Sequence, residues 1–480
     1  MRRPTVRIEN WPGDFRETSD IRDALAAALR AAEPETILKR TLTVEGSTLH
    51  AGATAFQLSR FDRIVVIGGG KAAAGMAAAL AKLLGDKVTA GVVNIPDSLP
   101  PLPRCSRIEL HRATHPIPGS EGVEGVKMML ELVRKPTDTD LVICLLSGGG
   151  SALLPMPAKG LRLSDIQRVT KLLLRSGAEI HEINAVRKHL SGIAGGRLAE
   201  RLYPAHVLSL IISDVVGDNP DSIASGPTVP DPSTYLDALA VLDKHKLVSR
   251  VPASVRKTLD DGILGRIKET PKANSKVFGR VHNLVVGGNE LSCRAAADLF
   301  RRRGYATTIL STRIQGEASE VGKGFSGLLL EMRDRLSASR PACVIAGGET
   351  TVTVRGRGVG GRNQELALSV ARGIAGLHGV CFASMGTDGL DGGTNAAGAI
   401  VDGRVIERAL SKGLDADSYI ERNDSHAFFK KVGGLIVTGA TGTNVNDIMV
   451  ATASGVGRAR RRPESAVQRP VDAFANESTK

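Results

Sequence analysis

A single local pattern recurs along this chain: an apolar run that stops abruptly at glycines and polar residues. It occurs at least six times, as RIVVIGGG (63–70), VICLLSGGGS (142–151), LSLIISDVVGD (208–218), NLVVGGNE (283–290), ACVIAGGET (342–350) and VCFASMGTDG (380–389). Apolar runs without polar alternation are typical of strands buried on both faces of a parallel sheet. Ligands of open α/β sheets bind at the carboxyl ends of such strands. The pattern therefore predicts an α/β enzyme for a small ligand, with a phosphorylated one favoured.

The stretch 142–155 shows this pattern most clearly. After the apolar run come Ser147, three glycines and Ser151. Consecutive glycines carry no Cβ, so the backbone can bend freely and approach a ligand closely. The N–H groups of such a turn, together with two hydroxyls, form a concavity that suits an anion. A tight turn that only lets the next element pack explains this stretch equally well when it is taken alone. The recurrence of the pattern favours a site.

The length and composition bound the domain organisation. A chain of 480 residues exceeds the size at which one hydrophobic core stops growing, so we expect two domains. The charged stretch 266–280 is poor in apolar residues and is the best candidate for the boundary. We therefore expect an N-terminal domain over 1–275 and a second domain over 276–457 that opens with the strand 283–286. The basic, polar tail 458–480 is expected to be disordered.

Charge and cysteine usage exclude several classes of protein. The net charge of +13 is compatible with nucleic-acid binding, but aromatic residues make up only 3% and leave few stacking platforms. Attraction for acidic metabolites explains the charge equally well. No apolar run reaches roughly 18 residues, so no membrane span is expected. The five cysteines show no CxxC spacing, which indicates a reducing, cytoplasmic compartment rather than a disulfide framework or zinc site.

The first glycine turn, GGGKAAAGM, carries Lys71. It fails the Walker A pattern, because Val65 stands where glycine is required and Ala72 replaces Ser or Thr. It fits the permissive dinucleotide fingerprint from Gly68 to Ala73, but the next strand ends without a clear ribose-binding acid. A lysine inside a turn before a helix favours a phosphate or carboxylate ligand. The alternative is a solvated loop lysine.

Two further segments place polar residues at positions where an anion or cation could bind. Within 181–200, Asn184, Arg187, Lys188 and Ser191 recur at helical spacing, so they share either an anion-facing or a solvated face. Asp214 follows the strand 207–212, and one or two such carboxylates with phosphates suit Mg²⁺.

The tip RGRGVGGRNQE pairs flexible glycines with three arginines before a helix. Arg362 lies at the N-terminus of that helix, where the arginine and the helix dipole would both favour an anion. The later stretches GTDGLDGGTN and TGATGTNVND offer carboxylates, hydroxyls and amides for a metal or a nucleotide.

These motifs together resemble the glycerate 2-kinase family that carries a MOFRL domain and is often labelled hydroxypyruvate reductase. The resemblance covers residues 15–457 and rests on IGGGKAAAGM, THPIP, LLSGGGSALL, NAVRKHLSGIAGGRLA, SDVVGDNPDSIASGPTVPD, GGETTVTVRGRGVGGRNQELAL, GTDGLDGGTNAAGA and GATGTNVNDI. It implies a Rossmann-like N-terminal domain, a smaller α/β C-terminal domain and an active site in the cleft between them. It also implies ATP-dependent phosphorylation of D-glycerate, usually to 2-phosphoglycerate.

The resemblance implies that the lysine of the first glycine turn and the arginine of GGRNQE are catalytic, and these are Lys71 and Arg362. One departure is visible, because Ala194 stands where a lysine is expected before Gly-Gly. The full hypothesis assigns catalysis to Lys71, Arg362 and Asp214; substrate contacts to Ser147, Gly149, Gly150, Ser151, Asn184 and Arg187; nucleotide contacts to Gly69, Gly70, Gly348, Glu349, Asp388, Thr443 and Asn444; and Mg²⁺ to Asp214 and Asp388.

The expected ligands are D-glycerate, ATP and Mg²⁺, with no nucleic acid or membrane as partner and a homodimer as an assembly to be tested. The chief alternative is an NAD(P)H-dependent hydroxypyruvate reductase, which the permissive fingerprint supports and the missing acid opposes. A nucleic-acid-binding regulator is a second alternative, motivated by the net charge and the RARRR tail.

Overall fold

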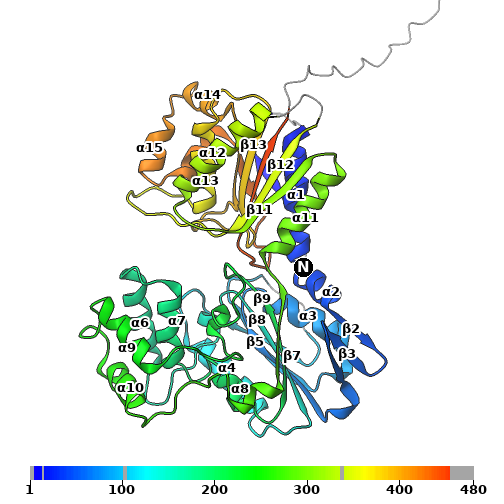
Figure 1. Cartoon of the computed structure of the whole chain (residues 1–480), viewed down its shortest axis with the longest axis vertical. Coiled ribbons are helices and arrows are strands. Elements are labelled where there is room, and N and C mark those ends of the chain that lie inside the picture. The colour runs from blue at the N-terminus through cyan, green and yellow to red at the C-terminus, as the bar shows by residue number, and fades with distance from the viewer. Residues whose placement is uncertain (1–4, 13–15, 101–104, 336–339, 455–480) are drawn as a thin grey trace, which may run out of the picture.

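The chain forms two lobes, each built around its own β-sheet (Figure 1). The computed structural model describes residues 5–12, 16–100, 105–335 and 340–454. The expected disordered tail lies outside the described residues. Within the described part of the chain, no helix is both long and apolar enough to cross a bilayer.

The lower lobe contains a six-stranded, wholly parallel sheet with the order β10-β9-β8-β5-β6-β7. Numbered by their order in the chain, these strands run 6-5-4-1-2-3, which is the doubly wound arrangement of dinucleotide-binding folds. The Rossmann-like fold expected for this region is confirmed. The strands are β5 (Arg63–Gly69), β6 (Ala90–Pro96), β7 (Ile108–Ala113), β8 (Asp140–Ser147), β9 (His206–Ile212) and β10 (Val281–Gly287).

Both faces of this sheet are buried, as the continuous apolar runs predicted. Alternate residues of β5 and β8 belong to two different core clusters on opposite faces. One cluster includes α2 (Pro34–Thr41) and α3 (Ala73–Leu84), and the other includes α4 (Ser120–Leu132) and α8 (Arg197–Leu202). A three-stranded antiparallel sheet, β2 (Leu42–Glu45), β3 (Thr48–Ala51) and β4 (Thr54–Gln57), joins the first cluster.

A helical group extends the lower lobe to one side (Figure 1). It packs around its own core and consists of α6 (Leu163–Arg175), α7 (Ile180–His189), α9 (Tyr235–Lys244) and α10 (Ala253–Ile263). A short helix, α5 (Gly150–Leu153), follows the central glycine turn. This group holds α7 beside the carboxyl ends of the parallel strands.

The upper lobe has a seven-stranded mixed sheet between two helical layers. Only β11 and β12 pair in parallel, while the other pairs are antiparallel. The strands, in sheet order, are β1 (Arg7–Glu9), β15 (Leu435–Val437), β14 (Gly398–Asp402), β13 (Val380–Gly386), β16 (Asp447–Ala453), β12 (Ala342–Gly348) and β11 (Ala306–Ile314). One layer contains α12 (Ala318–Arg335), α13 (Arg362–Gly373), α14 (Val405–Leu410), α15 (Ala416–Glu421) and α16 (Ser425–Val432). The other contains α1 (Arg16–Ala32) and α11 (Asn289–Arg302).

The chain passes between the lobes in an order that the sequence did not predict. The strand expected to open the second domain, 283–286, is wrongly assigned, because β10 extends the lower sheet beside β9. The N-terminal helix α1 lies in the upper lobe, where Ile21 and Leu25 pack in the same core as Phe300 of α11. The division into domains over 1–275 and 276–457 stays a prediction. Its boundary does not coincide with the division between the two sheets, because β10 belongs to the lower sheet.

Candidate active site

Two glycine turns interlock where the strand order of the lower sheet reverses, between β5 and β8. The Lys71 N–H donates to the Gly148 carbonyl oxygen (2.8 Å), and the Ala72 N–H donates to Ser147 Oγ (3.0 Å). Gly70 has φ of +146°, and a Cβ there would lie 2.1 Å from Ser147 Oγ. In a doubly wound sheet this reversal is the crevice where ligands bind. The two turns thus meet at the place where a ligand is expected. Gly70 and Ser147, which were predicted to contact the ligands, hold the two turns together in this structure.

Lys71 joins the two lobes. Its Nζ donates to Asp388 Oδ2 at 3.0 Å, and Asp388 lies in the turn after β13 of the upper lobe. The two side chains are 28% and 23% exposed. Beside the lysine stem lie Gly149 and the His115 ring, where a Cβ on Gly149 would approach His115 Nε2 to 2.9 Å. His115 belongs to the THPIP motif, and the sequence alone did not predict its position beside Lys71.

Asp214 packs directly against the central glycine turn. A Cβ on Gly148 would lie 2.1 Å from Asp214 Oδ2, so only glycine leaves room for this carboxylate. Burial, followed by the negative charge of Glu349, raises the pKa of Asp214 to about 6, although the Lys71 charge opposes the shift. Asn446 ties the two acidic residues together, because its Nδ2 donates to the Asp214 carbonyl oxygen (2.6 Å) and to Glu349 Oε2 (3.0 Å).

Arg362 is the second cation of this region, and two carboxylates hold it. Its Nε and Nη2 donate to the two oxygens of Asp447 (2.6 and 3.0 Å), and Nη1 lies 2.7 Å from Glu349 Oε1. Burial lowers the pKa of Arg362, but these carboxylates outweigh it and raise the pKa above its usual value. The helix N-terminus itself is already capped, since Asp391 accepts from the N–H groups of Asn363 and Gln364. A carboxylate of the protein itself therefore occupies this helix end, and the binding of a ligand anion there stays a prediction.

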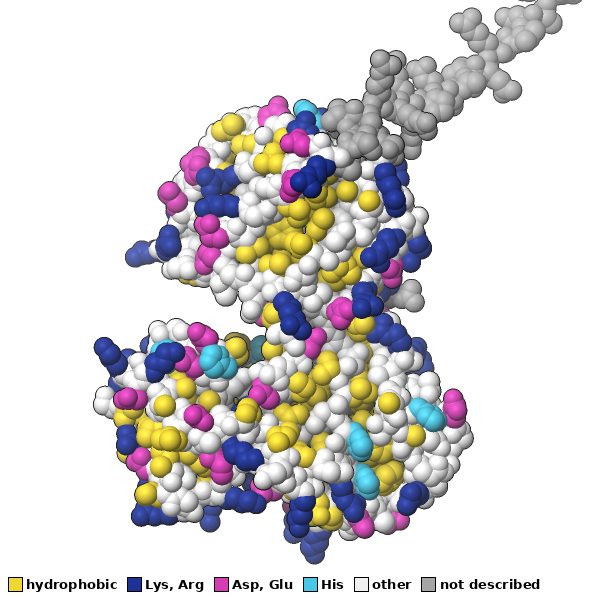
Figure 2. All heavy atoms as spheres, in the orientation of Figure 1, with side chains coloured by type: hydrophobic (Ala, Val, Ile, Leu, Met, Phe, Trp, Pro, Cys, Tyr) yellow, Lys and Arg dark blue, Asp and Glu magenta, His cyan; other side chains and the backbone are white. Residues whose placement is uncertain are grey.

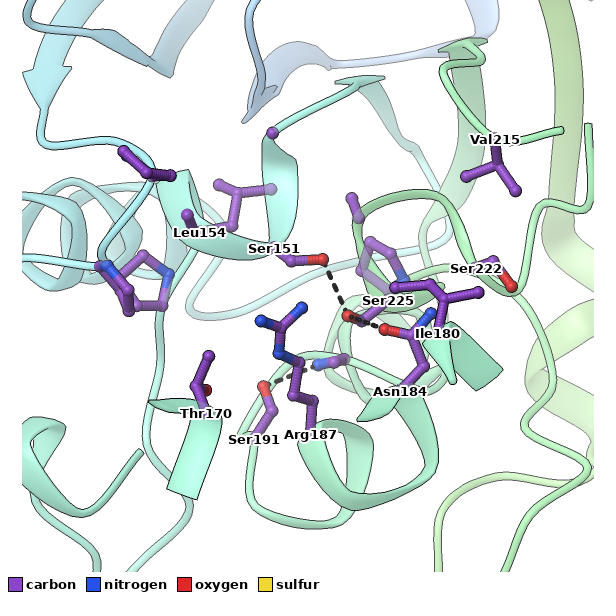
Figure 3. Close-up of a pocket in the computed structure, with 18 of the residues that line it drawn as sticks. Ser151, Leu154, Thr170, Ile180, Asn184, Arg187, Ser191, Val215, Ser222 and Ser225 are labelled. Atoms are coloured by element: carbon purple, nitrogen blue, oxygen red, sulfur yellow. Dashed lines mark hydrogen bonds between the residues drawn. The ribbon is translucent and has the colours of Figure 1, made fainter. Parts of the chain in front are cut away.

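A pocket of about 540 Å³ opens beside this cluster (Figure 3). Most of its lining comes from the lower lobe, and the upper lobe contributes Gln315, Glu349 and Thr351. In the space-filling view the surface is indented where the lobes meet (Figure 2). The structure brings these predicted residues to the pocket: Gly149, Ser151, Asn184, Arg187, Asp214 and Glu349.

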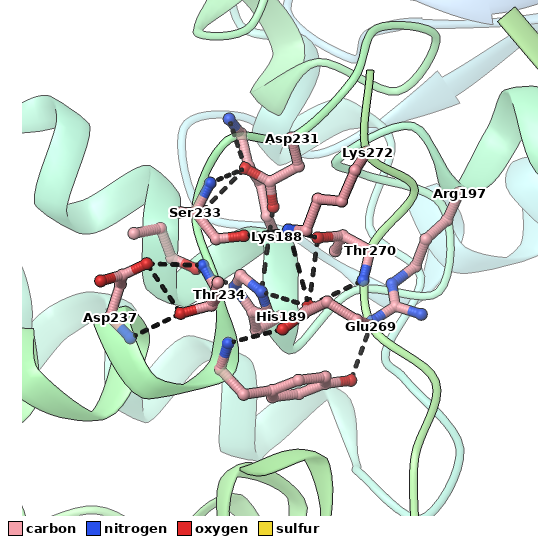
Figure 4. A network of polar contacts seen from close by, with 12 residues as sticks. Lys188, His189, Arg197, Asp231, Ser233, Thr234, Asp237, Glu269, Thr270 and Lys272 are labelled. Carbon is pink, nitrogen blue, oxygen red and sulfur yellow. Dashed lines mark hydrogen bonds and ion pairs between the residues drawn. The ribbon is translucent and has the colours of Figure 1, made fainter. Parts of the chain in front are cut away.

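Arg187 gives this pocket its positive charge. Burial lowers the pKa of its guanidinium, and no carboxylate pairs with it within the ranges that the structure describes. Lys188, expected on the same polar face, is instead 3% exposed and pairs with Asp231 at 3.3 Å. It belongs to a network with His189 and Glu269 that fixes the end of α7 (Figure 4). Of the two neighbouring cations, only Arg187 is directed to the pocket.

Other predicted contact residues are not part of the pocket lining, and their observed contacts are with other parts of the protein. A Cβ on Gly69 would meet Leu154, one on Gly150 would meet Ala224, and one on Gly348 would meet the Ile314 carbonyl oxygen. The Thr443 hydroxyl donates to the Ala32 carbonyl oxygen at 2.8 Å and is buried. Asn444 accepts the Asn446 N–H through its side chain at 3.3 Å. The roles of these residues in ligand binding stay predictions.

No group of three or more His, Cys, Asp or Glu side chains that could hold a metal occurs among the described residues. The carboxylates of Asp214 and Asp388 remain a donor set that fits an ion arriving with phosphates, because Mg²⁺ typically takes only one or two protein carboxylates in such sites.

The comparisons agree with this arrangement. Residues 20–260 match a family described as a domain of unknown function, DUF4147, and residues 342–447 match the MOFRL family. A D-glycerate 2-kinase of Thermotoga maritima is 43% identical over 81% of this chain and 90% of its own length. The chain belongs to the glycerate 2-kinase family with a MOFRL domain. A glycerate 2-kinase of Pyrococcus horikoshii is 40% identical over 88% of this chain and 94% of its own length.

The fold agrees with that of the family. A crystal structure of glycerate kinase from Thermotoga maritima matches with a TM-score of 0.79 and 39% identity, covering 91% of this chain and 99% of that one. The family membership that the eight sequence motifs predicted is confirmed. Lys71 and Asp214 lie in the first matched region, whereas Arg362, Asp388 and Asp447 lie in the MOFRL region. The charged cluster therefore needs both regions of the chain.

Sequence reasoning missed Asn446, Asp447 and the pocket-lining position of His115. Asn446 and Asp447 belong to the TGATGTNVND segment that was singled out, and the signal was the density of polar residues there. The pattern did not show which of them face the site, because Asp447 is also the first residue of a buried strand, β16.

Proposed function

We propose that this protein transfers the γ-phosphoryl group of ATP to D-glycerate and forms 2-phosphoglycerate. One observation carries the proposal: charged groups of both lobes meet at the edge of one pocket. The charge of Lys71 acts on the buried carboxylate of Asp214, Arg362 pairs with Glu349, which Asn446 links to Asp214, and among the described residues no carboxylate pairs with the Arg187 guanidinium in the pocket. Relatives named glycerate 2-kinase support the substrate pair.

Arg187 would bind the carboxylate of D-glycerate. Its guanidinium is partly buried and has no carboxylate partner in the described structure. An anionic ligand would therefore form charged hydrogen bonds with it without displacing a carboxylate of the protein. Asn184 and Ser151 line the same pocket and offer an amide and a hydroxyl to the remaining oxygens of the substrate. This geometry favours a small hydroxy acid over a neutral sugar.

Lys71 and Arg362 would neutralise the charge of the transferring phosphoryl group. Phosphoryl transfer depends on positioning and electrostatic stabilisation more than on covalent chemistry. Both cations are held by carboxylates in this structure, and the phosphates of a nucleotide would compete with Asp388, Glu349 and Asp447 for them. Asp214 lies at the pocket and would accept the proton of the attacking hydroxyl.

Asp214 and Asp388 would hold Mg²⁺ when it arrives with the nucleotide, and the ion would supply additional positive charge to the phosphates. The nucleotide would contact the turns around Gly69, Gly70 and Gly348, together with Glu349, Asp388, Thr443 and Asn444.

We further propose a cytoplasmic enzyme, because all five cysteines are free thiols. A homodimer is the assembly to test by sedimentation velocity.

The deciding experiment incubates the purified protein with D-glycerate, ATP and Mg²⁺ and identifies the products by phosphorus NMR. A 2-phosphoglycerate signal supports the proposal, and 3-phosphoglycerate keeps the kinase and changes the hydroxyl. A parallel absorbance trace with NADH and hydroxypyruvate tests the reductase. Consumption of NADH without any phosphoester would overturn the proposal. The structure gives no support for the reductase at the end of β6, where Asn94 Nδ2 donates to the main-chain oxygens of Gly122 and Leu153.

A further inference from the structure

A left-handed turn lines the pocket opposite Ser151. It spans Ala224, Ser225 and Gly226, whose φ values are +52°, +59° and +59°. Two of these three residues carry a Cβ, which crowds the backbone in the left-handed region and makes this conformation unfavourable. Backbone strain of this kind persists only where the surroundings enforce it.

The surroundings of this turn do enforce it. The N–H groups of Gly195 and Gly196 donate to the carbonyl oxygens of Ser225 (2.9 Å) and Gly226 (2.8 Å). On the other side, the Ala224 methyl group packs against Gly150, and a Cβ added to Gly150 would lie only 2.6 Å from that methyl group. Glycines from two distant segments therefore serve to hold Ser225 in place, with its side chain directed to the pocket.

Ser225 connects the two polar residues that we propose to contact the substrate. Its Oγ lies 2.9 Å from Ser151 Oγ and donates to Asn184 Oδ1 at 3.3 Å (Figure 3). Asn184 is 3% exposed, and its Nδ2 has no hydrogen-bond partner among the described residues. A buried donor without a partner costs free energy, and a ligand oxygen in the pocket would satisfy it.

The direction of these hydrogen bonds follows from the chemistry of the groups. An amide oxygen can only accept a hydrogen bond, so the Ser225 hydroxyl donates its single proton to Asn184 Oδ1. Ser225 Oγ can then only accept a hydrogen bond from the Ser151 hydroxyl. The Ser151 proton is therefore not available to a ligand. The free lone pair of Ser151 faces the ligand as an acceptor, while Asn184 Nδ2 and Arg187 face it as donors.

We infer that Ser225 is a positioning residue that makes the pocket selective for a 2-hydroxy acid over the corresponding 2-oxo acid. This inference rests on the proposed function. In the complex without nucleotide, the carboxylate would take the donors of Arg187 and Asn184, and the 2-hydroxyl of the substrate would donate to Ser151. During phosphoryl transfer that same proton would pass to Asp214. An oxo group has no proton to donate and would place its lone pairs against those of Ser151.

Isothermal titration calorimetry of the full-length protein with D-lactate and with pyruvate tests the inference, because these probes share a three-carbon carboxylate and differ at one oxygen. We expect wild-type protein to bind D-lactate roughly three- to tenfold more tightly, as one neutral hydrogen bond allows. In Ser225→Ala, the Ser151 proton is released and the preference falls to about onefold. Ser151→Ala removes the same acceptor without touching the left-handed turn and should give the same loss.

Ser209→Ala is the matched control, because Ser209 is also a buried serine that donates to a side chain, Thr228 Oγ1 at 2.9 Å, within the lower sheet. It should keep the wild-type preference. Equal binding of the two probes to wild-type protein, no binding of either, or an unchanged preference in both Ser225→Ala and Ser151→Ala would overturn the inference. Turnover of D-glycerate is measured separately, so failure of the proposed function is recognised independently of these affinities.

Discussion

Replacing Lys71 by methionine should abolish most of the kinase activity while leaving the fold intact. The variant keeps much of the aliphatic stem and removes the charge that lies 3.0 Å from Asp388. An ion pair between partly exposed side chains contributes only about 0–1 kcal/mol to the free energy of unfolding. For a chain of this size that corresponds to a fall in melting temperature of no more than about 4 °C.

The expected effect on turnover is much larger. Loss of one preorganised donor to a developing charge typically costs a factor of about 10²–10³ in kcat, or about 2.7–4 kcal/mol. The assay measures initial rates of 2-phosphoglycerate formation over a range of ATP and D-glycerate concentrations, together with a thermal melt of each protein. The separation of kcat from KM matters, because removing a residue that binds the ground state and the transition state equally raises KM and leaves kcat unchanged.

Lys82→Met is the matched control for this experiment. Lys82 lies on α3, the helix that follows the Lys71 turn. Its side chain is 72% exposed, and it also pairs with a carboxylate, Glu35, at 3.4 Å. It should leave both kcat and the melting temperature unchanged. A Lys71→Met enzyme that retains more than about a third of the wild-type kcat, or one in which only KM for ATP rises, would refute the proposed role of Lys71.

Three further outcomes follow from the geometry. Arg187→Leu should raise KM for D-glycerate about 10–100-fold, from the loss of a charged hydrogen bond, without lowering the melting temperature, because it removes a partly buried charge that has no carboxylate partner in the described structure. Gly150→Ala should destabilise the protein by about 1–3 kcal/mol in urea unfolding, since the new Cβ lies 2.6 Å from Ala224, whereas Gly327→Ala, on an open face, should not. Burial raises the pKa of Glu269, but hydrogen bonds lower it to about 2 from an ordinary value of 4.5, so its contribution is present above about pH 4.5 and lost toward pH 2. Because that side chain is 35% exposed, Glu269→Gln should cost about 1 kcal/mol at pH 7, and the difference should vanish near pH 2.

The six strands that the recurring pattern predicted are present, because a buried strand between glycine turns leaves a strong local signal. Their assignment to sheets depends on tertiary pairing, which local signals do not contain. Strand β10 was therefore expected in the second domain although it pairs with β9. Helix α1 packs in the upper lobe through its apolar face, but nothing in that face distinguishes the upper sheet from the lower one.

Individual site residues were easier to predict than their partners. Lys71 and Arg362 are cations beside glycine turns, which is an unusual local arrangement. Asp447 begins a buried strand and Asn446 precedes it, so neither stands out without the contacts that Arg362 and Asp214 provide. Asn184, Arg187, Lys188 and Ser191 were expected to share one face. However, Ser191 follows the end of α7, and Lys188 is buried in the network of Asp231.

The two passages of the chain between the lobes lie side by side. One is the break between α1 and α2, at residues 32–34, and the other is the step from β10 to α11, at residues 287–289. Gly287 is in contact range of Ile37, and Ser292 Oγ donates to the Ala28 carbonyl oxygen at 3.1 Å. The lobes are thus connected through two adjacent segments, and the upper lobe, which is built from residues before 32 and after 288, cannot be excised as a contiguous piece. A fragment cut at residue 275 would lose β10 from its sheet edge and expose the apolar face of α1, and it should aggregate where the whole chain does not.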